Sequence, residues 1–316
     1  MSTLTLRTKG PIQLSLFPGE EQPEPDEQPP APPLLQAGSK VVVSVSGGKD
    51  SICCLLLAIA IYGASNVIVH HQRIPEDWPQ TLEYIQAVCQ LLGVPLYVSQ
   101  AHYTGYKCAK CGEHYLTSEA QPYHRACGSR EGTYIMMVEC LLDLVKWRKM
   151  WPSLDVRFCT SYLKRDVWNY WARRNRELLG PAPILIMGER WRESRGRAKL
   201  PYIRRRTKME HVTEYRPILH YRRIEVFRAM RDAGIEPHYC YKAQGMTNED
   251  MYEKDVEGGP RMSCVICFLK PEEQLRASYN TKEGRPLIER GIAVEREIGH
   301  TLQRDHSLEG MVTPIT

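Results

Sequence analysis

The sequence predicts an α/β protein with a doubly wound, mostly parallel sheet and a cysteine-rich insertion. Apolar runs of strand length alternate with segments of helical length between residues 40 and 100, as in consecutive βαβ units. The alternation breaks between Ala101 and Thr133, where Gly, Cys and His residues interrupt the apolar pattern. A further buried strand, PILIMG, follows much later, at 183–188.

The predicted elements follow from apolar periodicity and from the glycines that end them. Strands are expected at 41–45 (VVVSV), 66–71 (NVIVHH) and 95–100 (PLYVSQ), with helices at 50–63 and 77–93 that end at Gly63 and Gly93. Further helices are expected around 134–150, 162–178 and 222–234, with an irregular Arg-rich stretch at 188–216.

The chain is expected to have three parts. Residues 19–35 are rich in Pro and acidic residues, so residues 1–37 are predicted to be a disordered arm and linker. Residues 38–275 form the expected domain, with the cysteine-rich insertion at 101–133. Residues 276–316 are polar and weakly patterned, and are expected to be a C-terminal tail.

Composition limits the compartment and the chemistry. No run of about 18 uncharged apolar residues occurs, and no signal peptide is recognisable, so a cytoplasmic protein without a membrane partner is expected. The 11 cysteines are an odd number and indicate metal binding or redox chemistry rather than a disulfide framework. Cys53, Cys54, Cys89 and Cys140 lie in apolar helical patterns and are expected to be small buried side chains.

The strongest motif is the turn SGGKDS, from Ser46 to Ser51, between the first strand and the first helix. A glycine turn that opens a helix presents backbone N–H groups and the positive end of the helix dipole to an anion. Gly47 and Gly48 allow close backbone approach, and Lys49 adds a cation. A Walker P-loop does not fit, because Val43 occupies the place of its first glycine and Asp50 follows the lysine.

SGGKDS instead resembles the PP-loop of the ATP pyrophosphatase superfamily, whose fold is Rossmann-like (adenine nucleotide alpha hydrolase-like). The resemblance implies that ATP binds at Ser46, Gly47, Gly48, Lys49, Asp50 and Ser51, that a substrate is adenylated, and that pyrophosphate leaves. Lys49 and Asp50 are then the catalytic residues, with Asp50 as a candidate Mg²⁺ ligand.

Further blocks resemble the phosphoadenosine phosphosulfate reductase-like branch. They are RFCTSYLKRDVWNYW at 157–171, GERWRESRGR at 188–197, the segment 215–241 and RMSCVICF at 261–268. The second block implies that Arg190, Glu193, Ser194 and Arg197 line the phosphate or substrate end of the site. After the second strand, His71 and Thr81 align with the branch, but Gln72 and Arg73 replace its acidic turn.

The first cysteine set is Cys159, Cys240, Cys264 and Cys267, of which the last two form a Cys-x-x-Cys knuckle. Similarity to the reductase-like branch implies a [4Fe–4S] cluster held by four thiolates, or by three with an open iron site. Cys240 is the weakest member, and a free thiol is an equal alternative for it. Structural zinc is the rival for the whole set. No cysteine follows Cys267, so the reductases' C-terminal nucleophile is missing and sulfonucleotide reduction is not expected.

The second set is Cys108, Cys111 and Cys127, with His114 or His124 as a fourth ligand and His124 preferred. A glycine follows both Cys111 and Cys127, which suits metal knuckles, and three Cys with one His fit structural Zn²⁺. The segment is too poor in apolar residues to fold alone, a deficit that a metal ion would remedy. An unmetallated loop, or cysteines that relay persulfide, are the alternatives.

Two features indicate nucleic acid. Between Gly188 and Arg223 there are twelve Lys or Arg against four Glu, a local net charge of +8 compared with +5 for the chain. QLSLF, from Gln13 to Phe17, resembles the peptide by which bacterial replication proteins bind the sliding clamp. A chance apolar pentapeptide is the alternative.

The protein is therefore expected to be an enzyme that uses ATP to adenylate nucleic acid for sulfur transfer. A sulfur-donor protein is expected to supply the sulfur. The expected enzyme resembles the sulfurtransferase of bacterial DNA phosphorothioation. The alternatives are adenylation of tRNA or a small molecule without Fe–S, and a non-catalytic nucleotide- or DNA-binding module with structural zinc.

Overall fold

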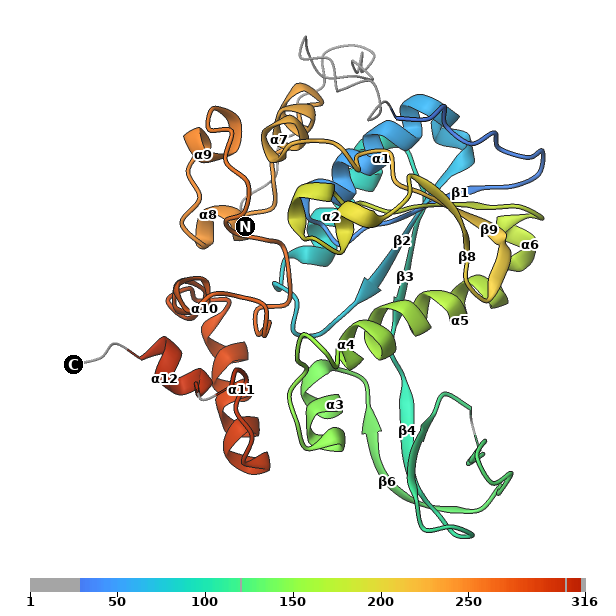
Figure 1. Ribbon diagram of the computed structural model, residues 1–316, viewed down its shortest axis with the longest axis vertical. Coiled ribbons are helices and arrows are strands. Elements are labelled where there is room, and N and C mark those ends of the chain that lie inside the picture. Colours follow the sequence, from blue (N-terminus) through green and yellow to red (C-terminus); the bar gives the residue numbers. More distant parts are fainter. Residues whose placement is uncertain (1–28, 120, 305, 314–316) are drawn as a thin grey trace. The chain divides into compact units, whose positions relative to one another are not determined.

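The computed structural model describes residues 29–119, 121–304 and 306–313 (Figure 1). Gln13–Phe17 and most of the predicted arm therefore lie outside the described residues. The chain divides into two compact units. Unit 1 holds the described residues up to His71, then Gln80–Val98 and Trp171–Ser263, and unit 2 holds Gln72–Pro79, Ser99–Tyr170 and the residues from Cys264 on. None of the described helices combines the length and apolarity needed to span a membrane.

A six-stranded sheet in the order β3-β2-β1-β7-β9-β8 forms the centre of unit 1 (Figure 1). β1 (Val41–Ser44) lies between β2 (Val67–Arg73) and β7 (Ile184–Ile186) and is parallel to both. β9 (Met209–Tyr215) is parallel to β7, and β8 (Ile203–Arg206) pairs with it in antiparallel fashion. β3 (Leu96–Gln100) is the other edge strand. The predicted doubly wound, mostly parallel sheet is confirmed.

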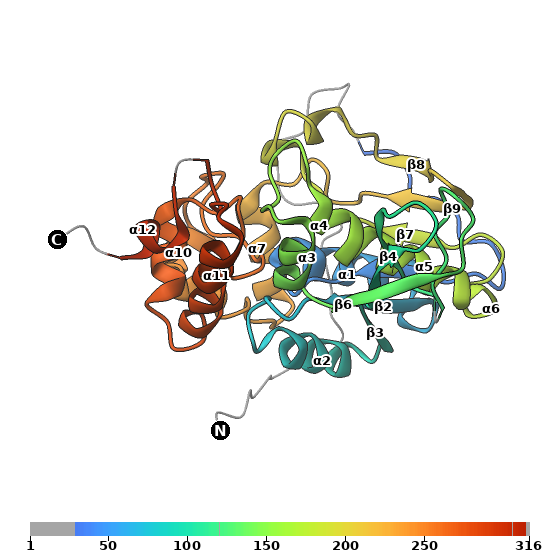
Figure 2. The same ribbon diagram turned by 90° about the horizontal axis from the view of Figure 1, so that it is seen from below.

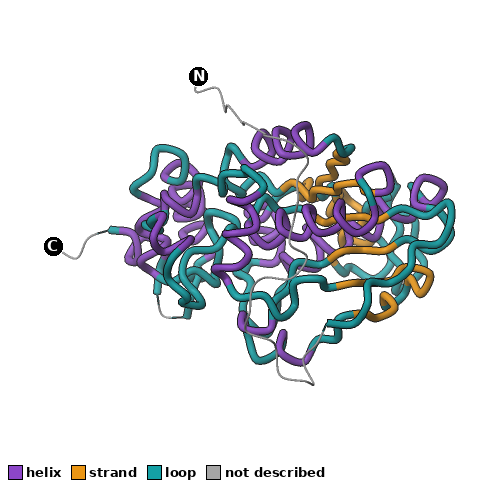
Figure 3. Tube along the Cα trace, turned by 90° about the horizontal axis from the view of Figure 1, so that it is seen from above, coloured by secondary structure: helices purple, strands orange, loops and turns teal. Residues whose placement is uncertain are grey.

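Both faces of the sheet are buried, as parallel strands require. Alternate side chains of the central strands pack against α1 (Lys49–Tyr62), α2 (Thr81–Leu92) and α7 (Arg223–Asp232). On β2, His70 does not belong to that cluster and stacks on Trp171 of α5 (Asp166–Arg174), with ring centroids 4.0 Å apart. Figure 3 distinguishes the strands in orange from the helices in purple.

The last residues of the predicted linker pack on unit 1. Leu35 contacts the hydrophobic core, and the Tyr62 hydroxyl donates a hydrogen bond to the Pro33 carbonyl (3.0 Å). The end of the predicted arm and linker, 1–37, is therefore ordered, because Leu35 packs on the core and the Pro33 carbonyl binds Tyr62 of α1. The irregular stretch predicted at 188–216 is also partly wrong, since its second half forms the β8–β9 hairpin.

Unit 2 contains an antiparallel three-stranded sheet in the order β5-β4-β6 (Figure 2). Its strands are β4 (Tyr103–Cys108), β5 (His114–Thr117) and β6 (Gly132–Val138). β6 occupies the start of the helix predicted at 134–150, and α3 (Leu141–Arg148) forms only the rest. Gly105 is needed in β4, because a Cβ there would lie 2.4 Å from the Trp147 ring of α3.

The segment predicted as a tail, 276–316, is largely helical. α10 (Glu272–Tyr279) is followed by α11 (Arg285–Ile298) and α12 (Leu308–Val312). The buried Glu295 carboxylate of α11 accepts hydrogen bonds from the backbone N–H groups of Leu302 and Leu308. These hydrogen bonds help to order the polar segment. Its weak apolar periodicity gave no sign of this structure.

The remaining helical segments are short. α6 (Arg176–Leu179), α8 (Cys240–Ala243) and α9 (Asn248–Tyr252) belong to unit 1. In unit 2, α4 (Phe158–Thr160) continues through a π-type turn, Ser161–Arg165, into α5. Single 3₁₀ turns occur at Ala64–Asn66, Trp191–Glu193 and Arg197–Lys199.

Candidate functional site

The predicted glycine turn lies at the topological switch point of the sheet. From β1 the chain passes through α1 to β2 on one side, whereas β7 joins on the other side later in the sequence. Loops after neighbouring parallel strands leave a crevice at such a point, where open α/β sheets bind ligands. The loops after β1 and β7 are in close contact, since a Cβ on Gly188 would lie 3.2 Å from the Asp50 carbonyl carbon.

The two glycines of the turn are needed for different reasons. Gly47 has φ +81°, a left-handed conformation that side chains disfavour. Gly48 leaves room for a neighbour, since a Cβ there would lie 2.9 Å from the Cβ of Met262. The Ser51 hydroxyl donates to the Gly48 carbonyl (2.9 Å) and accepts from the Ser46 N–H (3.2 Å), so the two serines brace the turn.

The charged residues of the turn form a chain of ion pairs. Lys49 Nζ lies 2.5 Å from one Asp50 carboxylate oxygen, and Arg190 Nε donates to the other at 2.7 Å. Arg190, whose side chain is 3% exposed, also donates from Nη1 to the Glu257 carboxylate at 3.0 Å. Burial lowers the pKa of Lys49. Burial opposes ionisation of Asp50, but the Lys49 and Arg190 charges outweigh it and lower the pKa of that carboxyl.

The other predicted residues of the arginine loop are arranged around Arg190. The Glu193 carboxylate accepts from the Arg190 backbone N–H (3.0 Å) and from the Arg197 guanidinium. The exposed Ser194 hydroxyl accepts from the Arg197 N–H (3.2 Å). The structure thus brings Arg190 to Asp50, while Glu193, Ser194 and Arg197 fix the loop that carries it.

Sequence reasoning missed three residues at the turn. The Tyr241 hydroxyl accepts from the Lys49 backbone N–H (2.9 Å), at the first residue of α1. Glu257 completes the ion-pair chain, and its carboxylate also accepts from the Arg223 N–H (2.8 Å). Met262 packs against Gly47 and Gly48. No spacing rule marks these positions. The Gly258–Gly259 pair, at φ +90° and +77°, is the one local signal of a tight segment here.

Much of the positive charge counted between Gly188 and Arg223 is neutralised internally. Glu214 is buried and binds Arg204, Arg206 and Arg216, and Arg216 also pairs with Glu189. Burial opposes ionisation of Glu214, but these guanidinium groups lower its pKa. Within 188–223, all of which the structure describes, the exposed basic side chains without an ion pair are Arg192, Arg195, Lys199, Arg205 and Lys208. Trp191 and Tyr202 pack edge to face on each other, with centroids 5.7 Å apart.

The first cysteine set is divided between the units. Cys159, Cys264 and Cys267 belong to unit 2. Cys240 belongs to unit 1, where its fully buried Sγ lies 3.2 Å from Met262 Sδ. Three of the four predicted ligands thus share one unit. The ligand atoms of these three do not all lie within 4.8 Å of one another, unlike those of the second set.

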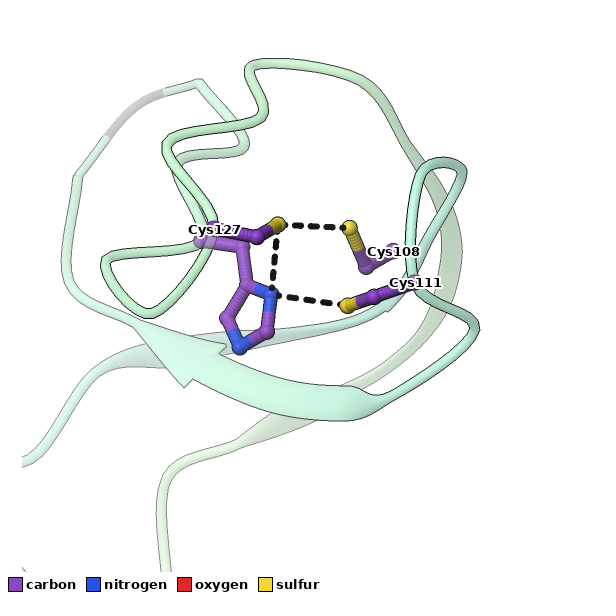
Figure 4. A group of neighbouring side chains, drawn as sticks. Cys108, Cys111 and Cys127 are labelled. Carbon is purple, nitrogen blue, oxygen red and sulfur yellow. Dashed lines mark hydrogen bonds between the residues drawn. The ribbon is translucent and has the colours of Figure 1, made fainter.

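The second cysteine set is assembled as predicted. Among the described residues, Cys108, Cys111, His124 and Cys127 are the one group of possible metal ligands whose ligand atoms all lie within 4.8 Å of one another. Figure 4 shows the three sulfurs and the imidazole converging between two loops. His114 instead lies beside Trp147, with ring centroids 5.9 Å apart, so the structure selects His124.

Comparison with known proteins supports the predicted resemblance. Residues 172–267 match the sequence model of the phosphoadenosine phosphosulfate reductase domain. An uncharacterized 37.8 kDa protein of Escherichia phage 186 is 28% identical over 256 residues, covering 74% of this chain and 68% of the phage protein.

Three of the solved structures that resemble this one are described by their TM-score, identity and coverage. Phosphoadenylyl-sulfate reductase from Candida auris has a TM-score of 0.40 at 12% identity, over 66% of this chain and 79% of that one. An FMN adenylyltransferase from Candida glabrata has a TM-score of 0.37 at 12% identity, over 71% and 60%. A U34-tRNA thiolase from Methanococcus maripaludis, with its [4Fe–4S] cluster, has a TM-score of 0.32 at 12% identity, over 83% and 72%.

Proposed function

We propose that this protein, a PP-loop chain of the phosphoadenosine phosphosulfate reductase-like group, is a cytoplasmic enzyme that uses ATP to adenylate a nucleic acid for sulfur transfer. The strongest support is that Lys49 and Arg190 both pair with Asp50 in the glycine turn at the switch point of the sheet. A helix N-terminus, a left-handed glycine and two cations at one place suit a triphosphate.

In the proposed reaction, an oxygen of the acceptor attacks the α-phosphorus of ATP. The bond from that phosphorus to the bridging oxygen breaks, and pyrophosphate leaves with the electron pair. Lys49 and Arg190 lie where they would neutralise the charge that develops on the phosphates. The outer sulfur of a persulfide on a donor protein then attacks the activated atom, and AMP leaves with the oxygen and the electron pair. A second thiol of the donor attacks the resulting disulfide, so the donor leaves as an internal disulfide and sulfur stays on the acceptor in place of the oxygen.

Mg²⁺ at Asp50 requires a rearrangement. Both carboxylate oxygens of Asp50 already accept from cationic side chains, one from Lys49 and one from Arg190. A hard divalent cation competes for the same oxygens. We therefore propose that metal-bound nucleotide draws Lys49 away from Asp50 onto the phosphates, which leaves one oxygen for the metal.

Cys159, Cys264 and Cys267 are the proposed ligands of the Fe–S cluster, which would provide the place from which sulfur is delivered. Cys240 is a weaker candidate, because its thiol is buried against Met262 in the other unit. Arg192, Arg195 and Lys199 are exposed and supply positive charge for a polyanionic acceptor. Docking to a sliding clamp through Gln13–Phe17 remains part of the proposal for location at DNA.

Pyrophosphate release from ATP tests the activity. Anaerobically purified protein is incubated with ATP, Mg²⁺ and DNA or tRNA, and Lys49→Ala is compared with Lys40→Ala, a lysine whose Nζ binds the Ser65 carbonyl at an exposed position. We expect Lys49→Ala to lower the rate at least about 100-fold, which corresponds to about 2.7 kcal/mol. Equal rates in the two variants would refute the proposal, as would the absence of release with every acceptor.

The visible spectrum separates the Fe–S proposal from its rivals. Broad absorbance that is lost in Cys264→Ser and retained in Cys89→Ser would support a cluster, since Cys89 is buried in α2. A colourless protein that still releases pyrophosphate would favour adenylation without Fe–S. A colourless protein that binds ATP without turnover would favour the non-catalytic module.

A further inference from the structure

We infer that Cys108, Cys111, Cys127 and Nδ1 of His124 form a closed tetrahedral Zn²⁺ site, and that Glu113 orients the histidine. Nothing in the proposed adenylation uses these residues. They belong to the three-stranded sheet of unit 2, whereas the glycine turn belongs to unit 1. The inference therefore stands or falls independently of the proposed function.

The first argument is the spacing of the ligand atoms. Cys108 Sγ and Cys127 Sγ lie 3.6 Å apart, and His124 Nδ1 lies 3.3 Å from the sulfurs of both Cys111 and Cys127. Zinc–sulfur and zinc–nitrogen bonds of ordinary length predict tetrahedron edges of about 3.8 Å between sulfurs and about 3.6 Å between sulfur and nitrogen. A disulfide would bring two sulfurs to about 2.05 Å. Three of the six distances are therefore within about 0.3 Å of the edges of such a tetrahedron, and all four ligand atoms lie within 4.8 Å of one another.

The second argument is that two backbone turns of the same form present the ligands. Cys108 and Cys111 are three residues apart, as are His124 and Cys127. In each turn, the glycine after the second ligand, Gly112 or Gly128, has positive φ and donates its N–H to the carbonyl of the first ligand, at 3.0 Å and 2.8 Å.

The next pair of hydrogen bonds repeats the correspondence. The Cys108 N–H donates to the Glu113 carbonyl (2.8 Å), and the His124 N–H donates to the Ser129 carbonyl (2.9 Å). The His124 turn therefore matches the Cys-x-x-Cys knuckle bond for bond, with an imidazole in place of the first thiol. Two such knuckles that face each other supply the four ligands of a closed site.

The surroundings of His124 determine which ring nitrogen binds. Nδ1 points at the sulfurs, and Nε2 lies 3.5 Å from a Glu113 carboxylate oxygen. The ring is buried and stacks on Tyr115, with centroids 4.7 Å apart. A carboxylate at the second nitrogen favours the proton there, which leaves the Nδ1 lone pair for the metal. Glu113 is thus a positioning residue rather than a ligand.

Zinc fits this donor set better than the other common metals. Three thiolates and an imidazole are soft or borderline ligands, which exclude Mg²⁺ and Ca²⁺, and four protein ligands leave no open position for chemistry. The sheet that carries the site has a largely exposed edge strand, since Tyr134 is 56% and Ile135 40% exposed. A metal ion would supply the stability that this sheet does not obtain by burying side chains.

Metal analysis of the full-length chain tests the site. In a background of Cys264→Ser and Cys267→Ser, which removes ligands of the other set, we expect one zinc per chain. We expect Cys111→Ser and His124→Ala to lose it, and His114→Ala, the matched control on the same sheet, to keep it. Loss in His114→Ala with retention in His124→Ala would overturn the assignment, as would a background protein that binds no zinc.

Three further measurements keep the test decisive if a variant fails to fold. His124→Cys should bind zinc where His124→Ala does not, because a fourth thiolate can complete the tetrahedron. Glu113→Gln should weaken zinc affinity about 10–100-fold, measured by competition with a chelator. In the ¹⁵N spectrum of histidine-labelled, zinc-loaded protein, His124 should carry its proton on Nε2. A proton on Nδ1, or unchanged affinity in Glu113→Gln, would overturn the role given to Glu113.

Discussion

At the scale of single residues, Gly47 and Gly48 are adjacent in one turn, but each must be glycine for a different reason. The sequence motif does not reveal this difference. Gly47 is needed for its φ of +81°, and Gly48 for the space that Met262 occupies. Sequence reasoning identified both glycines from the turn motif. It could not identify Met262, because that contact joins residues more than 200 positions apart and follows no spacing rule.

This difference predicts different responses to a second mutation. Gly47→Ala and Gly48→Ala should each destabilise the protein by about 1–3 kcal/mol, the first through backbone strain and the second through overpacking. Met262→Gly removes the Cβ that crowds Gly48, so the double variant with Gly48→Ala should be more stable than the sum of the two single effects predicts. Met262→Gly should not rescue Gly47→Ala, because the strain there comes from the φ of +81°. Urea denaturation of the unchanged protein, the three single variants and the two double variants measures this coupling, and strict additivity at Gly48 would contradict the packing argument.

At the scale of elements, α3 depends on a residue far from it in sequence. Glu76, which is 0% exposed, accepts hydrogen bonds from the backbone N–H groups of Leu141 and Leu142 at 2.9 Å and 3.2 Å. A carboxylate at the N-terminus of a helix accepts from two backbone N–H groups that have no partner within the helix. Its negative charge also interacts favourably with the positive end of the helix dipole. The helix predicted at 134–150 begins only at Leu141, where this long-range cap fixes its start.

Removing the charge of Glu76 should destabilise unit 2. Glu76→Gln keeps one acceptor oxygen but places an NH₂ group against a backbone N–H, so we expect a loss of about 1–3 kcal/mol. The matched control is Glu83→Gln, in the first turn of α2 at an exposed position. Amide hydrogen exchange should show faster exchange at Leu141 and Leu142 in Glu76→Gln alone. Equal exchange in both variants would show that α3 does not need this cap.

At the scale of the whole molecule, the sequence predicted the parts that local patterns encode. The first βαβ unit runs only from Val41 to Arg73, and the glycine turn and the pair Cys108 and Cys111 are shorter still. These local parts of the prediction agree with the structure. The ion pairs of Glu214 show the limit. Counting charges predicted a concentration of positive charge that indicates a nucleic-acid partner, but pairing across the β8–β9 hairpin neutralises much of that charge. Such pairing depends on strand register, which composition does not contain.

Unit 1 also buries two histidines in neutral form, which sets its response to acid. Burial lowers the pKa of His70 to about 3 and that of His238 to about 4, from 6.5. Above pH 6.5 both residues are neutral in the folded and unfolded states, and they contribute no pH dependence. Below it the unfolded chain takes up protons that the folded chain does not, so stability falls as the pH decreases from 6.5 towards the folded values. At pH 5 each histidine should cost about 2 kcal/mol.

His70→Phe removes one titrating group and keeps a ring to stack on Trp171. The difference in unfolding free energy between pH 7 and pH 5, measured by urea denaturation, should therefore be smaller by about 2 kcal/mol than in the unchanged protein. His300→Phe, at an exposed position, should leave the difference as it was. If His70→Phe and the unchanged protein lose the same stability on acidification, His70 is protonated in the folded state and the stacking on Trp171 does not exclude its charge.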